Sequence, residues 1–265
     1  MKSIHFFLIF SLYLLTIFTV LLTAEFSGYE GFLKSMTVEN GIFETLSVIG
    51  LLSISFYGFY TLYFFRKNFS KYLCFLILFF SFLTFLAAME EISWGQHIFH
   101  FSSTDYFIEN NLQHETNLHN FINPNFFSSL IYTTIYTVFV FIPLLYKTFF
   151  KDVSILRYFD LKMHHILIIL FSSSLQLYFY DDFGVYVDML IHLVALAFFG
   201  YVLWKEKYYS DLLFHYLVVL NTTVLFMFYH EIFQFKNMQY EIREMFVVLA
   251  VLFIFINFIQ KEKIE

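Results

Sequence analysis

Two acid–histidine pairs in this sequence have the spacing that places both side chains on one face of a helix. Asp188 and His192 are four residues apart, and Glu115 and His119 are also four apart. Side chains four residues apart share one face of a helix, so each pair could reach a common ion or exchange a proton. Imidazole and carboxylate groups bind zinc and other first-row metals, and they also act as general acids and bases. These residues therefore predict a metal site or an acid–base site.

Its position in the chain makes Asp188–His192 a stronger candidate for a functional pair than Glu115–His119. It lies one to two turns inside an apolar run, where an ionisable side chain is costly unless it faces the interior of a helix bundle or a wet cavity. The structural alternative is an internal pair that fixes helix packing. Two further groups end apolar runs, the carboxylates of Glu90 and Glu91 and the imidazole of His230. We predict three catalytic residues and four ligands of a divalent metal such as zinc: Glu90, Glu91 and Asp188 for catalysis, and Glu115, His119, His192 and His230 for the metal.

The stretch from Glu90 to Asn120 concentrates many of these groups. It reads EEISWGQHIFHFSSTDYFIENNLQHETNLHN and contains five acidic residues, four histidines and Trp94, without Lys or Arg. Such a density of polar groups is unusual in a chain that is 60% hydrophobic. The structural alternatives are hydrated carboxylates at a helix end and an interfacial tryptophan anchor. We expect this polar segment to cover a site outside the membrane or to contribute to it.

The composition indicates which elements must position these residues. Mean hydropathy is +0.70, aromatic residues make up 24% of the 265 residues, and charged residues only 14%. A helix crosses the hydrocarbon core with about 20 apolar residues, and it satisfies its own backbone hydrogen bonds in lipid. The single cysteine, Cys74, excludes an intramolecular disulfide, and no basic patch suggests a nucleic-acid partner. The sequence predicts an all-α polytopic membrane bundle.

Eight apolar runs are long enough to be considered as spans. We expect one integral-membrane domain over residues 1–265, with a polar extracytoplasmic segment at 90–125 between the third and fourth helices. The first run resembles a signal peptide, but its apolar part is longer than usual, so we expect a retained helix. The runs lie at about residues 5–24, 42–65, 72–89, 126–146, 165–180, 185–204, 212–229 and 245–259.

The distribution of basic residues predicts the orientation. Cytoplasmic loops carry an excess of Lys and Arg. With the N-terminus inside, twelve of the 15 basic residues fall on the cytoplasmic side, and Lys34, Lys236 and Arg243 are the exceptions. On the same assignment, 15 of the 21 acidic residues lie on the outer side or at outer helix ends. We therefore predict eight spans with both termini in the cytoplasm.

Two short motifs resemble a known group of proteins. The residues from Glu90 to Gln96 read EEISWGQ, and those from Glu115 to Asn120 read ETNLHN. This motif pair is similar to one found in a group of uncharacterised bacterial multi-pass membrane proteins, where EEISWGQ is followed by Arg, whereas this chain has His97. The resemblance implies a bacterial cytoplasmic membrane, and it transfers no reaction.

Three functions fit these features. The first is a membrane-embedded hydrolase or transferase that acts on a lipid or lipid-linked substrate at the outer leaflet, through a metal-bound water or an acid–base pair. The second is a non-catalytic assembly or sensing protein whose polar segment binds a partner. The third is a proton- or ion-coupled transporter with Glu91, Asp188 and His192 as a relay, although few polar groups continue toward the cytoplasmic side.

Overall fold

The computed structural model describes residues 10, 11, 14, 41–174, 183–207, 211–228 and 238–264. Every regular element within these residues is helical. The chain divides into two compact units. The first unit contains Asn125–Val247, and the second contains Ser35–Pro124 together with Val248–Glu265. The expectation of a single domain stays a prediction.

Within the described part of the chain, five helices are long and apolar enough to cross a membrane. This confirms the prediction of a helical multi-pass membrane protein. Helix boundaries match the apolar runs closely, because the polar residues that end each run can lie outside the hydrocarbon core. The five candidate spans are Ile42–Asn68, Lys71–Glu91, Phe126–Phe149, Tyr186–Lys205 and Glu241–Gln260.

The other three predicted runs give no candidate span among the described residues. Helix α9 (Met163–Ser172) has 10 residues and ends well before residue 180, the expected limit of the fifth run. At 1.5 Å per residue it is about 15 Å long, which is half of the hydrocarbon thickness. Helix α11 (Asp211–Phe228) follows the seventh run. The first run lies almost wholly outside the described residues.

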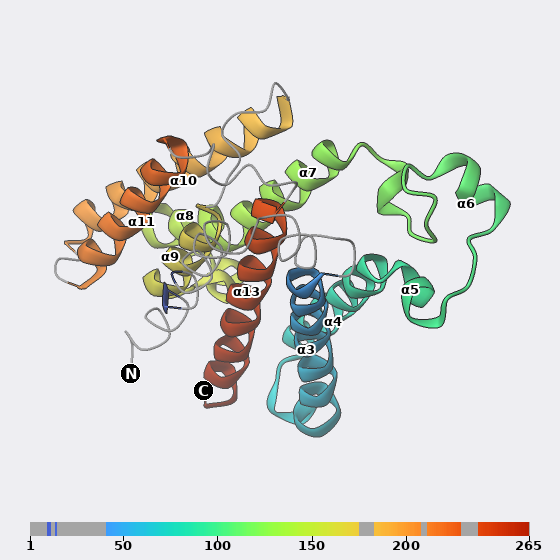
Figure 1. Cartoon of the computed structure of the whole chain (residues 1–265). Coiled ribbons are helices and arrows are strands. Elements are labelled where there is room, and N and C mark those ends of the chain that lie inside the picture. Colours follow the sequence, from blue (N-terminus) through green and yellow to red (C-terminus); the bar gives the residue numbers. More distant parts are fainter. Residues whose placement is uncertain are drawn as a thin grey trace. The chain divides into compact units, whose positions relative to one another are not determined.

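The second unit is organised around a hairpin of α3 (Ile42–Phe65) and α4 (Lys71–Glu91), which lie side by side in Figure 1. Small residues allow the two backbones to approach closely, as is usual where membrane helices pack. A Cβ atom on Gly58 would lie only 1.8 Å from Oγ of Ser81. Ser70 begins α4 as its N-cap, where its hydroxyl accepts a hydrogen bond from the backbone N–H of Leu73.

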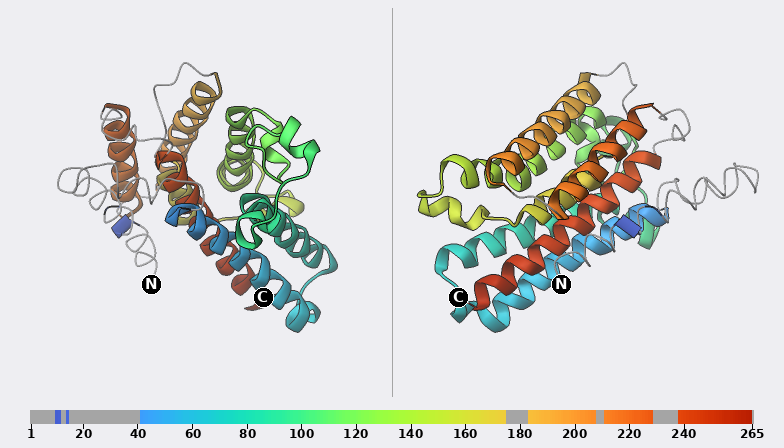
Figure 2. Two further views of the ribbon diagram at one scale, coloured as in Figure 1. Left: turned by 45° about the vertical axis from the view of Figure 1, so that its right-hand side comes forward. Right: turned by 90° about the vertical axis from the view of Figure 1, so that its left-hand side faces the viewer.

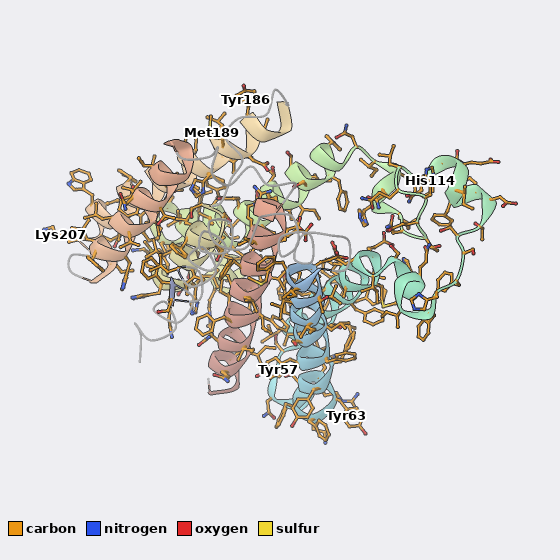
Figure 3. All side chains as sticks on the ribbon, viewed as in Figure 1. Tyr57, Tyr63, His114, Tyr186, Met189 and Lys207 are labelled. Atoms are coloured by element: carbon orange, nitrogen blue, oxygen red, sulfur yellow. The ribbon has the colours of Figure 1, made fainter. Side chains whose placement is uncertain are left out.

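Part of α13 completes the second unit. Helix α13 (Met238–Ile264) contributes the residues from Val248 onward, which run beside α3 in Figures 1 and 2. A Cβ atom on Gly50 would lie 2.6 Å from a methyl carbon of Val248. The ring centroids of Tyr57 and Phe255 are 6.4 Å apart, and Figure 3 labels Tyr57 on α3.

The polar segment of the second unit contains only short elements. They are η2 (Ser93–Gly95), α5 (Gln96–Phe99), α6 (Asp105–Asn110) and η3 (His119–Phe121). Figure 3 labels His114 within this segment, which extends sideways from the end of α4.

The first unit contains a long interrupted helix. Helix α7 (Pro124–Tyr136) passes through a π-helical turn, η4 (Thr137–Phe141), into α8 (Ile142–Phe149). Pro143 explains the interruption, because it has no backbone N–H and its ring displaces the preceding turn. Helix α10 (Phe183–Lys205) packs against α8, α9 and α11.

The C-terminal ends of α8 and α10 lie together. Nζ of Lys205 donates to the carbonyl of Thr148 at 3.4 Å, and Nζ of Lys151 lies 3.6 Å from Glu206. Nζ of Lys205 also lies 5.0 Å from the ring centroid of Phe149. The two helices therefore run in the same direction, and this end of the first unit carries Lys147, Lys151 and Lys205.

Candidate functional site

Two layers of buried polar side chains occupy the interior of the first unit. On α7, Tyr132 and Tyr136 are four residues apart, and on α10, Asp188 and His192 have the same spacing. Each helix therefore presents both of its residues on one face, about 6 Å apart along the axis. All four side chains are buried. The predicted Asp188–His192 pair does share a helix face, as its spacing required.

The first layer joins Asp188 to Arg243 of α13. The guanidinium Nη1 lies 3.7 Å from Oδ2 of Asp188, and the side chains are 2% and 7% exposed. The guanidinium carbon lies 3.6 Å from the ring centroid of Tyr132, a cation–π contact. Nη2 also reaches Oγ of Ser128 at 3.5 Å. A buried charge needs a partner of this kind, and the pair makes the layer electrically neutral.

The second layer joins three helices through His192. The Tyr136 hydroxyl is 2.5 Å from Nδ1 of His192, and Nε2 is 3.0 Å from Oγ1 of Thr223 on α11. Thr223 donates its only hydroxyl hydrogen to the carbonyl of Val219, so it must accept from Nε2–H. Nδ1 therefore accepts the proton of the Tyr136 hydroxyl. This pattern assigns the Nε2–H tautomer of His192.

The predicted metal site stays a prediction, because His230 lies outside the described residues. They contain no group of three or more His, Cys, Asp or Glu side chains that could hold a metal ion. The lone pair of His192 at Nδ1 accepts the Tyr136 hydroxyl, so a metal at this nitrogen would have to displace it. What the geometry does provide is a positive charge on Arg243 and a buried hydrogen-bonded pair, Tyr136 and His192.

The two EEISWGQ and ETNLHN motifs fold against each other in the second unit. Glu115 is 9% exposed, and its Oε2 accepts hydrogen bonds from the Ser93 hydroxyl at 2.6 Å and the Asn117 amide at 2.9 Å. The Gln96 side-chain carbonyl accepts from the backbone N–H of Thr116 at 2.8 Å. Buried polar groups must be satisfied in this way. The motif pair therefore builds a hydrogen-bonded network that closes the polar segment.

Glu90 holds the same segment to the end of α4. Its Oε1 accepts from the Trp94 indole at 2.6 Å, and its Oε2 accepts from the backbone N–H groups of Leu118 and His119 at 2.6 and 3.1 Å. Nδ1 of His119 lies 3.5 Å from the same oxygen. Both oxygens thus help to position the backbone and the indole, and the catalytic role predicted for Glu90 stays a prediction.

The turn between these residues has an unusual backbone. Ser93, Trp94 and Gly95 have φ values of 46°, 55° and 87°. The left-handed region costs a residue with a Cβ atom about 1–2 kcal/mol. Ser93 and Trp94 both bind acidic side chains, Glu115 and Glu90, and these bonds offset the cost.

The predicted site residues fall in both units. Asp188 and His192 belong to the first, and Glu90, Glu115 and His119 to the second. Glu91 is the half-buried last residue of α4. Glu115 to Leu118 are not helical, so the helical spacing argument does not apply to Glu115 and His119. His230 lies outside the described residues, and whether the polar segment covers a site stays a prediction.

Sequence reasoning missed four members of the buried layers: Tyr132, Tyr136, Thr223 and Arg243. We had placed Arg243 in an outer connection, but α13 is already helical at Met238 and Arg243 is buried inside it. The available signal was the four-residue spacing of Ser128, Tyr132 and Tyr136.

Comparisons of the chain with protein-family models, curated proteins and solved structures found no match.

Proposed function

We propose that this chain is a bacterial cytoplasmic-membrane protein with eight spans and both termini in the cytoplasm, and that it acts as a hydrolase or transferase on a lipid or lipid-linked substrate. The observation that carries the enzymatic part is the pair of buried layers around Asp188–Arg243 and Tyr136–His192. Ionisable residues inside membrane helices are rare, and they mark functional sites by default.

The orientation is supported by the basic residues. Because α8 and α10 end together, one side of the first unit collects Lys147, Lys151 and Lys205. The Asp188–Arg243 layer lies toward the opposite end: Asp188 is near the N-terminus of α10, and Tyr132 is in the N-terminal half of the interrupted helix that α7, η4 and α8 form. With basic ends in the cytoplasm, this layer lies toward the outer leaflet.

Each side chain then has a role in the proposed reaction. Arg243 binds an anionic oxygen of the substrate, such as a phosphoryl oxygen, and stabilises charge that develops there. Asp188 is a positioning residue, because it orients the guanidinium. Its Oδ1 is buried and has no hydrogen-bond partner among the described residues, so it is available to a substrate hydroxyl.

Tyr136 and His192 transfer the proton. The attacking hydroxyl or water gives its proton to the Tyr136 oxygen while the Tyr136 proton passes to Nδ1 of His192. The reverse transfer then protonates the leaving group. Thr223 fixes the ring by accepting from Nε2–H. An acid–base pair of this kind contributes roughly 10²- to 10⁴-fold to a rate.

The test is conversion of lipid by purified protein in nanodiscs made from a total bacterial lipid extract, followed by mass spectrometry. Wild type should convert one lipid class. Tyr136→Phe should slow this at least about 100-fold. Tyr216→Phe is the matched control, because the Tyr216 hydroxyl binds the Leu196 carbonyl and not the cluster. No conversion by wild type, or equal rates for wild type and Tyr136→Phe, would overturn the proposal.

A proton-coupled transporter is the second candidate. The observation that favours it is the hydrogen-bonded row Tyr136–His192–Thr223, which links α7, α10 and α11. It predicts proton flux into liposomes that Tyr136→Phe abolishes and Tyr216→Phe does not. Flux without lipid conversion would favour this candidate over the enzyme.

A further inference from the structure

Large apolar side chains are exposed around the polar segment, although the segment itself is rich in acids and amides. Trp94 is 41% exposed, Ile98 59%, Phe99 76% and Leu118 62%. We call these four residues the apolar collar. Large apolar side chains that are exposed together mark a surface that contacts a partner or a membrane.

Specific contacts hold the collar at the end of α4. Glu90, in the last turn of α4, binds both the Trp94 indole and the backbone N–H of Leu118. Ring atoms of Phe99 lie against Gly95, where an added Cβ atom would be 3.0 Å away. Trp94, Phe99 and Leu118 are therefore held close to the point at which the chain leaves α4.

The position of the collar next to α4 indicates that the membrane contacts it. Helix α4 is long and apolar enough to cross a membrane, and it exposes a series of large apolar side chains along its length. The collar follows the end of α4 at Glu91, and no basic residue occurs between Glu90 and Asn120. Tryptophan is enriched at the boundary between hydrocarbon and headgroups, and a Trp94 indole bound to a carboxylate suits that boundary. The exposed residues of α4 include Phe75, Leu78, Phe79, Phe82 and Leu83.

The charge of the polar segment indicates which kind of lipid the collar contacts. Five acidic residues and no Lys or Arg occur between Glu90 and Asn120. Anionic headgroups attract basic segments and repel acidic ones. We infer that the apolar collar inserts into the interfacial layer of a zwitterionic leaflet and anchors the polar segment on the membrane surface. This inference is independent of the proposed function, because it concerns only the second unit.

The test uses site-directed spin labels on the full chain in zwitterionic phosphatidylcholine vesicles. Cys74→Ser provides a background without cysteine, since Cys74 is the only one. Single cysteines replace Phe99 and Leu118 of the collar, and Glu109→Cys is the matched control, an exposed polar position of the same segment. Collisions with oxygen report lipid, and collisions with a water-soluble nickel chelate report water.

We expect labels at positions 99 and 118 to favour oxygen over the nickel chelate by at least about threefold relative to position 109. Replacing a third of the lipid by phosphatidylglycerol should reduce that ratio. Equal ratios at all three positions would overturn the inference. A label shielded from both reagents would also overturn it, because the chain itself would then cover the collar. Spin–spin broadening that disappears on dilution with unlabelled protein would overturn it too, because a second copy would then cover the collar.

Discussion

The carboxylate of Asp188 lies 3.7 Å from the guanidinium of Arg243, and both side chains are almost fully buried among apolar helices. The contact joins α10 to α13 within the first unit. It places a fixed positive charge beside Tyr132 and one turn from His192. This relationship accounts for the intramembrane acid that the sequence singled out, and in the proposed function Arg243 is the group that binds the anionic part of the substrate.

Breaking the Asp188–Arg243 pair should destabilise the protein more than removing both charges together. Asp188→Asn and Arg243→Gln each leave one buried charge without its partner, which costs about 3–5 kcal/mol. The double variant should recover part of that loss. A double-mutant cycle on the free energy of unfolding in mild detergent measures the coupling. Asp160→Asn, which removes the partner of Lys147, is the control on a partly exposed pair. Additive losses would contradict the buried pair.

Removing the charge of Glu115 should loosen the polar segment without affecting the first unit. Glu115→Gln leaves one carbonyl oxygen to accept the bonds from Ser93 and Asn117, but both bonds lose the charge assistance of the carboxylate, at a cost of about 1 kcal/mol. Hydrogen exchange should accelerate for the backbone amides of residues 93–120 and remain unchanged in α10. Uniform acceleration across the chain, or none, would contradict the network. Glu109→Gln, in the same segment, is the control.

Close packing of α3 on α4 should make Gly58→Ala destabilising. A Cβ atom at this position would lie 1.8 Å from Oγ of Ser81, which donates to the carbonyl of Ile77. Overpacking of this kind costs about 1–3 kcal/mol. Ser81→Ala should restore part of the loss, and the melting temperature in detergent measures both effects. Ser53→Ala, on the same helix but toward its exposed side, should change little. A Gly58→Ala variant as stable as wild type would contradict this packing.

Reporter fusions test the proposed orientation. A fluorescent protein fused after Glu265 should fold and fluoresce, because the C-terminus is proposed to lie in the cytoplasm. Alkaline phosphatase, which requires an oxidising compartment, should be active when fused after His114 and inactive when fused after Asn68. Activity at both phosphatase sites, or a dark C-terminal fusion, would contradict eight spans with both termini inside.

Composition and the length of the apolar runs were sufficient to predict the helical membrane class and most helix boundaries. The second run, expected at residues 42–65, is α3 with the same limits. Such runs are readable because a membrane span must be continuous and apolar. The short α9 differs from its run because composition does not determine where a helix ends.

The site was only partly predictable. Asp188 and His192 stood out because charge inside an apolar run is rare. Their partners Arg243 and Tyr136 come from helices distant in the sequence, and no local pattern specifies which helices pack together. Glu90 and Glu115 were predicted as chemical groups, but their oxygens accept hydrogen bonds that fold the polar segment. The hydrogen bonds show that both carboxylates help to fold the segment, and their predicted chemical roles stay predictions.

The most direct test of the central claim is native mass spectrometry of the protein released from mild detergent. If Arg243 binds the anionic group of a membrane-embedded molecule, wild type should retain a bound lipid or lipid-linked anion. Arg157→Gln, which changes an arginine of η5 (Ser154–Phe159), should retain it equally. The Arg243→Gln variant should lose at least about 90% of the lipid occupancy, equivalent to a loss of about 1.4 kcal/mol or more in binding free energy. The double variant Arg243→Gln/Asp188→Asn, which also removes the unpaired buried charge, should lose as much. Unchanged occupancy in both Arg243 variants, with monodisperse protein, would contradict the account.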